Sequence, residues 1–136
     1  MKILVDTSVW IDFFSRREAI HTECLKKLIS SGADICLCGH VLAEVLRGIR
    51  HEEQFRKINR RFQVLEFLRM RESTFMLSAA VYRNLRSKGI SLKNTVDTFI
   101  AAVAIEHQVP LLHNDSDFEL ISRHYPLKIF NLESDE

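Results

Sequence analysis

Residues 2–14 read KILVDTSVWIDFF, and this stretch holds the pattern that decides the fold. Lys2–Val5 is a short apolar run typical of a buried strand. Asp6, Thr7 and Ser8 are residue types that cap helices, and the apolar run after them continues as a helix. We therefore predict a first strand that passes directly into a helix.

The rest of the chain repeats this alternation of strands and helices. Further strands are predicted at 35–38, 64–67, 110–112 and 127–130, of which 64–67 lies in an ambiguous stretch. Further helices are predicted at 19–31, 41–50, 73–87 and 117–123. One more helix is predicted to follow the capping residues Asn94 and Thr95 and to end at Glu106. Short apolar strands separated by helices indicate a parallel sheet covered on both faces. We expect a three-layer α/β/α fold with a central, mostly parallel sheet of five strands.

Length and composition indicate one domain over residues 1–136. A chain of 136 residues with 46% hydrophobic and 27% charged residues is long enough for a single core and has an ordinary balance for a globular protein. Its longest apolar segment is far shorter than the ~20 residues of a membrane span, and Met1-Lys2 leads straight into a strand. We expect a cytoplasmic protein with no membrane partner.

Four acids stand at isolated points beside apolar segments. Asp6 ends the run ILV, Glu44 interrupts VLAEVL, Asp97 opens VDTFIAAVAI, and Asp115 follows PLLHN. A carboxylate beside apolar packing loses hydration, so it must be paired, hydrogen-bonded or metal-bound. Ligands of parallel α/β sheets bind beyond the carboxyl ends of the strands, where we place three of these acids.

Such carboxylates, once brought together, favour a divalent cation. Two like charges ~4 Å apart cost about 1 kcal/mol in water and about 4 at an effective dielectric of 20. Oxygen ligands suit Mg²⁺ or Mn²⁺, and one or two such ions can activate water for attack on a phosphodiester. The alternative is structural: Asp6, Asp115 or Asp117 caps a helix, Asp97 interacts with its helix dipole, and Glu44 pairs with an arginine.

The segment between Arg47 and Arg71 is basic, with eight basic residues against three acidic ones. Such a stretch is either a phosphate-binding surface or an ordinary solvated helix face. The candidate RNA-binding residues are Arg47, Arg50, Arg56, Lys57, Arg60 and Arg61.

Four blocks of the chain resemble those of the PIN-domain ribonucleases, particularly the VapC-type toxins of bacterial and archaeal toxin-antitoxin pairs. The blocks are ILVDTSVWIDFF, LAEVLRGI, VDTFIAAVA and LLHNDSDF, in the family's order and over nearly the whole chain. The resemblance implies that Mg²⁺ or Mn²⁺ is bound by Asp6, Glu44, Asp97 and Asp115. It also implies a hydrogen bond from Ser8 to Asp6.

The last block departs from the family pattern. His113 stands where the family usually has Thr or Ser, so a hydroxyl contribution there is lost. His113 is open to three interpretations: a phosphate contact, a role in proton transfer, or a surface residue without a role. Asp117 is a candidate auxiliary acid.

The resemblance further implies an endoribonuclease that cuts structured RNA, such as transfer or ribosomal RNA. It implies a homodimer and a small antitoxin whose C-terminal segment wraps the toxin, giving a heterotetramer or larger assembly. The expected docking surface comprises Val9–Phe14 and Leu42–Ile49, where Trp10, Phe13 and Phe14 are either partner anchors or core residues.

Two other functions compete with this interpretation. One is a module of the same fold that binds protein or RNA without catalysis, which the presence of all four acids disfavours. The other is a phosphatase-type domain with Asp6 as nucleophile, although such sites often read DxD and here Thr7 and Ser8 follow. No GxGxxG or GxxxxGK[ST] pattern supports a nucleotide-binding enzyme.

Overall fold

A computed structural model describes residues 1–132 of the chain. Its strands are β1 (Lys2–Val5), β2 (Asp34–Cys38), β3 (Glu66–Leu68) and β4 (Leu111–Leu112). Its helices are α1 (Thr7–Phe14), α2 (Ile20–Ser30), α3 (Gly39–Arg47), α4 (Glu52–Gln63), α5 (Glu72–Ser87), α6 (Val96–His107) and α7 (Ser116–Ser122). The alternation predicted from the sequence is therefore present, with boundaries that shift by a few residues.

The sheet is parallel, with the strand order β3-β2-β1-β4. The prediction of five strands was wrong, because the described chain forms a sheet of four. Residues 127–130 make only an isolated parallel bridge, Leu111 to Ile129. The physical reason is that β4 has only two residues, so the segment can pair with β4 only at Leu111. The N–H of Leu111 donates to the carbonyl of Lys128, and the carbonyl of Leu111 accepts from the N–H of Phe130.

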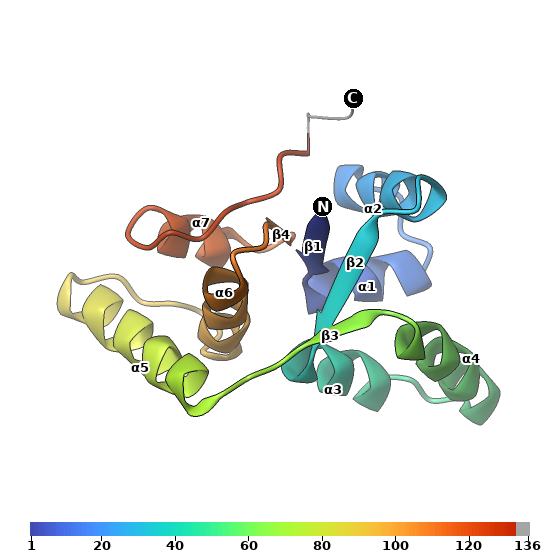
Figure 1. Cartoon of the computed structure of the whole chain (residues 1–136), viewed down its shortest axis with the longest axis horizontal. Helices are drawn as coiled ribbons and strands as arrows, with labels where there is room; N and C mark the ends of the chain where they lie inside the picture. Colours follow the sequence, from blue (N-terminus) through green and yellow to red (C-terminus); the bar gives the residue numbers. More distant parts are fainter. Residues whose placement is uncertain (133–136) are drawn as a thin grey trace.

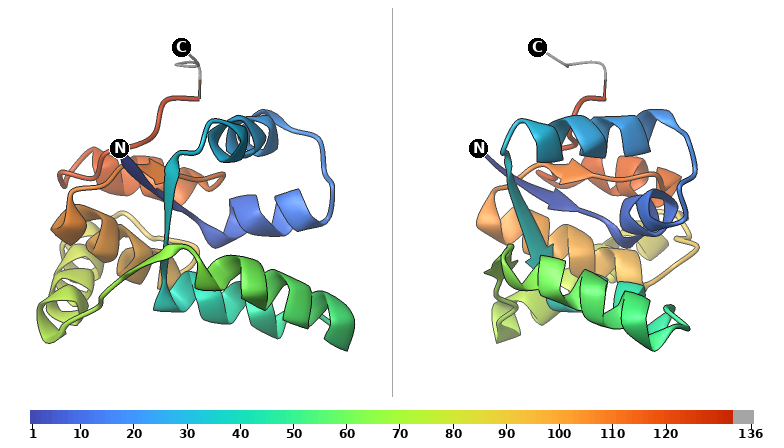
Figure 2. Two further views of the ribbon diagram at one scale, coloured as in Figure 1. Left: turned by 45° about the vertical axis from the view of Figure 1, so that its right-hand side comes forward. Right: turned by 90° about the vertical axis from the view of Figure 1, so that its right-hand side faces the viewer.

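Helices lie on both sides of this sheet. Figures 1 and 2 show α1 and α2 on one side and α5 and α6 on the other, with α3 and α4 near the end of β2. Strand β1 pairs with both β2 and β4, so it lies in the interior of the sheet. The ends of β1, β2 and β4 therefore lead into neighbouring loops and helix starts.

Helix α3 ends earlier than predicted, at Arg47 instead of Arg50. Gly48 is its C-cap residue, and the basic stretch that follows forms a separate helix, α4, after a short turn. Hydrophobic residues of α4 at Ile58 and Phe62 are buried, whereas its charged residues are exposed. The α4 helix is amphipathic, so its basic residues lie on the face away from the core.

The core is formed by the strands and by the small residues of α6. Leu4 and Val5 of β1 are fully buried, and so are Ala101 and Ala102 of α6. Small side chains let α6 approach its neighbours closely, which brings its first turn near the strand ends. No helix in residues 1–132 is long and apolar enough to cross a membrane.

Candidate metal centre

Asp6 lies at the junction of β1 and α1 and caps the helix. Its Oδ2 accepts hydrogen bonds from the backbone N–H of Ser8 at 3.1 Å and from the Ser8 hydroxyl at 2.6 Å. The same hydroxyl accepts from the N–H of Asn114, at 3.2 Å, so Ser8 connects Asp6 to the loop after β4. Asp6 is only 3% exposed, and this burial raises the pKa of its carboxyl. Asp6 therefore caps α1, and this role engages one oxygen of its carboxylate.

Glu44 projects from the middle of α3 with its side chain 16% exposed. Its Oε1 accepts a 2.7 Å hydrogen bond from the hydroxyl of Thr7, the first residue of α1. Its Oε2 lies 3.9 Å from Arg47, the i,i+3 contact considered from the sequence, but that arginine is 74% exposed. The shorter contact is the one to Thr7, so α1 holds both Asp6 and Glu44.

The contact between Thr7 and Glu44 was not predicted from the sequence. The position of Thr7 directly after the first acid marked it only as helix-capping chemistry, and nothing in the sequence connects it to a residue 37 positions away. The interaction arises because α1 and α3 pack against each other. Asp6 and Glu44 interact as a result, and the charge of Glu44 further raises the pKa of Asp6.

Asp97 lies in the first turn of α6 and is 4% exposed. Its Oδ2 is buried and has no hydrogen-bond partner among the described residues. Burial raises the pKa of Asp97 to about 9, with further increases from the carboxyl of Asp115 and from the charges of Asp6 and Asp117. A carboxylate in this position is strongly destabilised when ionised, unless a cation is present.

Asp115 and Asp117 approach Asp97 from the start of α7. Carboxylate oxygens of these three residues all lie within 4.8 Å of one another. Asp115 is the N-cap of α7 and accepts from the N–H of Asp117 at 3.0 Å. Asp117 is 1% exposed, and its Oδ2 accepts from the backbone N–H groups of Lys93 at 2.7 Å and Asn94 at 3.3 Å.

The structure therefore places the predicted acids in one region, although not at equal distances. The tight group comprises Asp97, Asp115 and Asp117, whereas Asp6 interacts electrostatically with both Asp97 and Glu44. The donors are hard carboxylate oxygens, which suit Mg²⁺ or Mn²⁺. The buried, unpartnered Oδ2 of Asp97 is a ligand atom without another use in the described structure. These residues fit a divalent cation.

His113 is buried beside the cluster, with its side chain 8% exposed. Its Nδ1 accepts from the N–H of Asp115 at 3.1 Å, and its Nε2 lies 3.1 Å from a carboxylate oxygen of Glu119. Both ring nitrogens are thus engaged within the protein, and the ring also contacts Phe118. His113 is therefore not an isolated surface side chain, because it contacts Asp115 and Glu119.

The six candidate RNA-binding residues lie on α3, on α4 and in the turn between these helices. Arg47 lies beside Glu44, and Arg56 lies 3.6 Å from Glu52 along α4. Lys57 and Arg61 line a groove between α1, α2 and α4, and Arg50 lines a smaller cavity next to it. Arg60 is exposed on α4.

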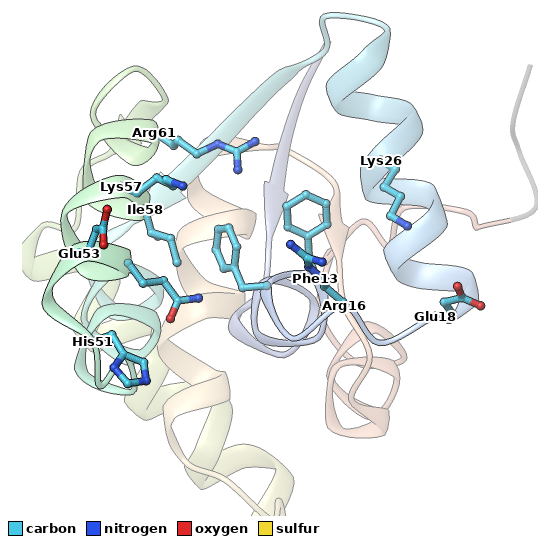
Figure 3. A pocket seen from close by; sticks show the side chains of 11 residues that line it. Phe13, Arg16, Glu18, Lys26, His51, Glu53, Lys57, Ile58 and Arg61 are labelled. Atoms are coloured by element: carbon cyan, nitrogen blue, oxygen red, sulfur yellow. The ribbon is translucent and has the colours of Figure 1, made fainter.

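The groove beside α4 has an aromatic wall and a basic rim. Its volume is about 780 Å³, and its lining includes Phe13 and Phe14, the basic residues Arg16, Lys26, Lys57 and Arg61, and the acidic residues Glu18 and Glu53. Figure 3 shows Lys57 and Arg61 reaching from α4 towards the side of the groove that carries Phe13. Trp10, in contrast, is 4% exposed and stacks on Phe14 with 5.6 Å between ring centroids, so it belongs to the core.

Comparisons with known proteins identify this combination of fold and acids. A family model described as PIN domain matches residues 3–123. Ribonuclease VapC11 of Mycobacterium tuberculosis is 31% identical over 123 residues, covering 89% of this chain and 92% of the relative. Ribonuclease VapC1 of Methanocaldococcus jannaschii is 31% identical over 131 residues, covering 96% and 88%.

Solved structures give the same fold. The chain superimposes on the structure of VapBC2 from Rickettsia felis with a TM-score of 0.75 at 22% identity, covering 96% of this chain and 98% of that one. VapBC-1 from nontypeable Haemophilus influenzae gives 0.73 at 21% identity, with 98% and 100% covered. The chain belongs to the PIN-domain family. Within that family it is a VapC-type ribonuclease toxin, a nuclease of the hydrolase class.

Proposed function

We propose that the chain is an endoribonuclease that hydrolyses structured RNA with one or two Mg²⁺ or Mn²⁺ ions held by Asp6, Glu44, Asp97 and Asp115. The observation that carries the proposal is the buried Oδ2 of Asp97, which lacks a partner in residues 1–132 and lies among like charges. A relative of the same fold supports the substrate class: VapC20 of Mycobacterium tuberculosis, 20% identical with a TM-score of 0.61, is described as a toxin that cleaves the sarcin-ricin loop.

The proposed chemistry follows from how the carboxylates are held. A bound divalent ion supplies a water of lowered pKa and neutralises charge on the phosphate. Thr7 fixes the orientation of Glu44, and Ser8 fixes that of Asp6. These two acids are therefore pre-oriented at the site, and one of the carboxylates of Asp6, Glu44 and Asp97 takes the proton of the attacking water. The products carry a 5′-phosphate and a 3′-hydroxyl.

Cleavage of total cellular RNA tests this function. Purified protein and its Asp97→Asn variant are each incubated with Mn²⁺, with Mg²⁺ and with excess EDTA. Discrete fragments from the unaltered protein alone, abolished by EDTA, support the proposal and reveal the RNA class. Equal cleavage by the variant contradicts it, and a 2′,3′-cyclic phosphate end contradicts the hydrolytic mechanism. Absence of RNA cleavage by the folded, metal-bound protein would favour a binding module of the same fold.

We further propose that a cognate antitoxin occupies the groove beside α4 and neutralises the nuclease. The structural relatives VapBC2 and VapBC-1 carry the toxin-antitoxin pair in their descriptions. In this chain Arg16, Lys57 and Arg61 make no ion pair within residues 1–132, and they surround Phe13 and Phe14. An acidic segment with an apolar anchor complements such a groove.

A homodimer is also part of the proposal. Phe67, Phe75 and Met76 are 51%, 44% and 67% exposed, and Phe75 contacts Phe99, which follows Asp97 on α6 by two residues. Exposed apolar groups of this kind indicate an interface near the acidic cluster. We propose that two copies meet there, and that with antitoxin they form a heterotetramer or larger assembly. Light scattering of the protein and of its Phe75→Asp variant distinguishes dimer from monomer.

We also propose that residues 1–136 form a single PIN domain and that the protein acts in the cytoplasm. Its relatives VapC11 and VapC1 align over about nine tenths of the chain or more, which supports one domain. The RNA substrates proposed above are cytoplasmic in bacteria and archaea. Fractionation of cells that express the protein tests this location.

A further inference from the structure

Asp117 differs from the other acids of the cluster in what its carboxylate contacts. Its Oδ2 accepts two backbone N–H groups from the turn before α6, from Lys93 at 2.7 Å and from Asn94 at 3.3 Å. The 2.7 Å distance is that of a charge-assisted hydrogen bond. Asp97 shows the opposite arrangement, with a buried Oδ2 that has no donor among the described residues. One oxygen of Asp117 is engaged by the protein, whereas Asp97 has a buried oxygen that is open to a ligand.

The turn that Asp117 holds is the turn that starts α6. The side-chain oxygen of Asn94 accepts from the N–H of Val96 at 3.0 Å, and its carbonyl accepts from the N–H of Asp97 at 3.1 Å. Asn94 thus binds the first two amides of α6 while its own amide binds Asp117. A continuous set of hydrogen bonds joins the start of α7 to the backbone of Asp97.

We infer that Asp117 is a positioning residue that sets Asp97 through Asn94, and that it is not a ligand of the metal. This inference rests on the proposed function, because it concerns the same cation site. The proximity of Asp117 to Asp97 and Asp115 follows from its place in the first turn of α7, one residue beyond Ser116. Groups that orient ligands affect metal affinity almost as strongly as some ligands do.

The test separates the charge of Asp117 from its ability to accept hydrogen bonds. Asp117→Asn keeps an oxygen for the two amides and removes the charge, whereas Asp117→Ala removes both. Asp115→Asn is the matched control, because it removes the charge of the neighbouring acid in the same loop. Mn²⁺ affinity is measured by calorimetry for each variant, together with RNA cleavage.

We expect Asp117→Asn to bind Mn²⁺ within about 3-fold of the unaltered protein, and Asp117→Ala to bind roughly 10–100-fold more weakly. Asp115→Asn should lose affinity although Asn resembles Asp in shape. Equal losses in Asp117→Asn and Asp115→Asn would overturn the inference, because both acids would then act through charge on the ion.

A second measurement needs neither metal nor activity. In EDTA, hydrogen exchange at the amides of Lys93, Asn94 and Asp97 should be faster in Asp117→Ala and little changed in Asp117→Asn. Unchanged hydrogen exchange at these amides in Asp117→Ala would show that the two hydrogen bonds from Lys93 and Asn94 to Asp117 do not hold the turn. If the unaltered protein neither binds Mn²⁺ nor cuts RNA, the proposed function fails, while the exchange result still decides whether Asp117 positions Asp97.

Asn94→Ala keeps the inference testable if Asp117→Ala does not fold. This variant leaves every acid in place and removes the side chain that caps Val96. Weaker Mn²⁺ binding by Asn94→Ala supports positioning through the turn. Affinity equal to that of the unaltered protein contradicts the part of the inference that depends on the Asn94 side chain, because Asn94→Ala keeps the backbone N–H that binds Asp117 and the carbonyl that binds Asp97.

Discussion

The acidic cluster and the groove beside α4 are two regions of opposite charge that share helix α1. This helix has eight residues, so about 12 Å separates its ends. Asp6 caps its start, in a region where burial and like charges raise the pKa of the acids. Phe13 and Phe14 lie at its end, where they line the groove together with basic side chains and contact the buried Trp10.

The two regions affect the stability of the fold in opposite ways. Aromatic packing around Trp10 and Phe62 buries apolar surface and stabilises the fold. The cluster brings together carboxylates that repel each other, and one of them has an unpartnered buried oxygen. Ligand binding should therefore stabilise the cluster more than the groove, and substitutions in the two regions should separate catalysis from partner binding.

The largest expected effect is on catalysis, from Asp97→Asn. In the proposed site its unpartnered oxygen and its position among the acids would make it the central ligand, so cleavage should fall by more than the roughly 10–100-fold typical of residues that only orient ligands. Initial rates on a defined RNA with Mn²⁺ measure this. Antitoxin affinity serves as the control and should be unchanged, whereas a parallel loss of antitoxin binding would mean that the two regions are not independent.

Charge reversal in the groove should give the opposite result. The double variant Lys57→Glu, Arg61→Glu replaces two exposed cations of the groove wall. Antitoxin affinity should fall roughly 10-fold or more, because like charges then face an acidic segment, and salt should reduce the difference. Titration calorimetry at two salt concentrations measures this. RNA cleavage that fell as steeply would place the RNA, instead of the antitoxin, in the groove.

A smaller effect is expected from Thr7→Val, which removes one hydroxyl and preserves shape. Glu44 would lose its 2.7 Å hydrogen bond and its orientation, so Mn²⁺ affinity should fall about 10-fold. Thr7→Ser is the matched control, since it retains the donor. If Thr7→Val binds Mn²⁺ as tightly as the unaltered protein, Thr7 has no part in orienting Glu44.

The smallest expected effect is on the stability of the metal-free protein as pH changes. The folded-state pKa of Asp97, about 9, lies above its ordinary value of 3.8, so the folded state binds this proton more tightly than the unfolded state. The resulting stabilisation is complete below about pH 4 and is lost as pH rises towards 9. In EDTA the thermal midpoint should therefore decline between pH 5 and 9 by a few degrees.

Asp97→Asn provides the control for this pH dependence. The variant cannot ionise at this position, so its midpoint should exceed that of the unaltered protein near pH 8 and should vary less with pH. Mn²⁺ should raise the midpoint of the unaltered protein and have less effect on the variant. Identical pH profiles for the two proteins would show that Asp97 does not hold a proton in the folded, metal-free state.

Much of this arrangement could be predicted from local sequence. The strand and helix that meet at Asp6 follow from an apolar run before capping residues, and Glu44 is conspicuous because apolar residues surround it. Residues 127–130 also carry a strand pattern, but pairing requires a neighbour long enough to bind it. Strand β4 has only two residues, a fact that the sequence of 127–130 does not contain.

Other features depend on packing between distant segments. The bond from Thr7 to Glu44 requires α1 to lie against α3, and the bonds from Asp117 to Lys93 and Asn94 require α7 to lie against the start of α6. Which basic residues of α4 face the groove could not be predicted from the sequence either, because it depends on how the helix is rotated against its neighbours. The sequence left open whether this basic stretch binds phosphate or is an ordinary solvated helix face.

Local sequence patterns are enough to specify the order of the elements, the identity of the acids and the likeness to PIN-domain nucleases, because strand and helix patterns and short motifs are local properties. The contacts that each acid makes depend on the tertiary structure. It left an oxygen of Asp97 unpartnered, and it engaged Asp117 with two backbone amides. The physical reason is that hydrogen bonding and burial depend on which segments pack together, which these motifs do not specify.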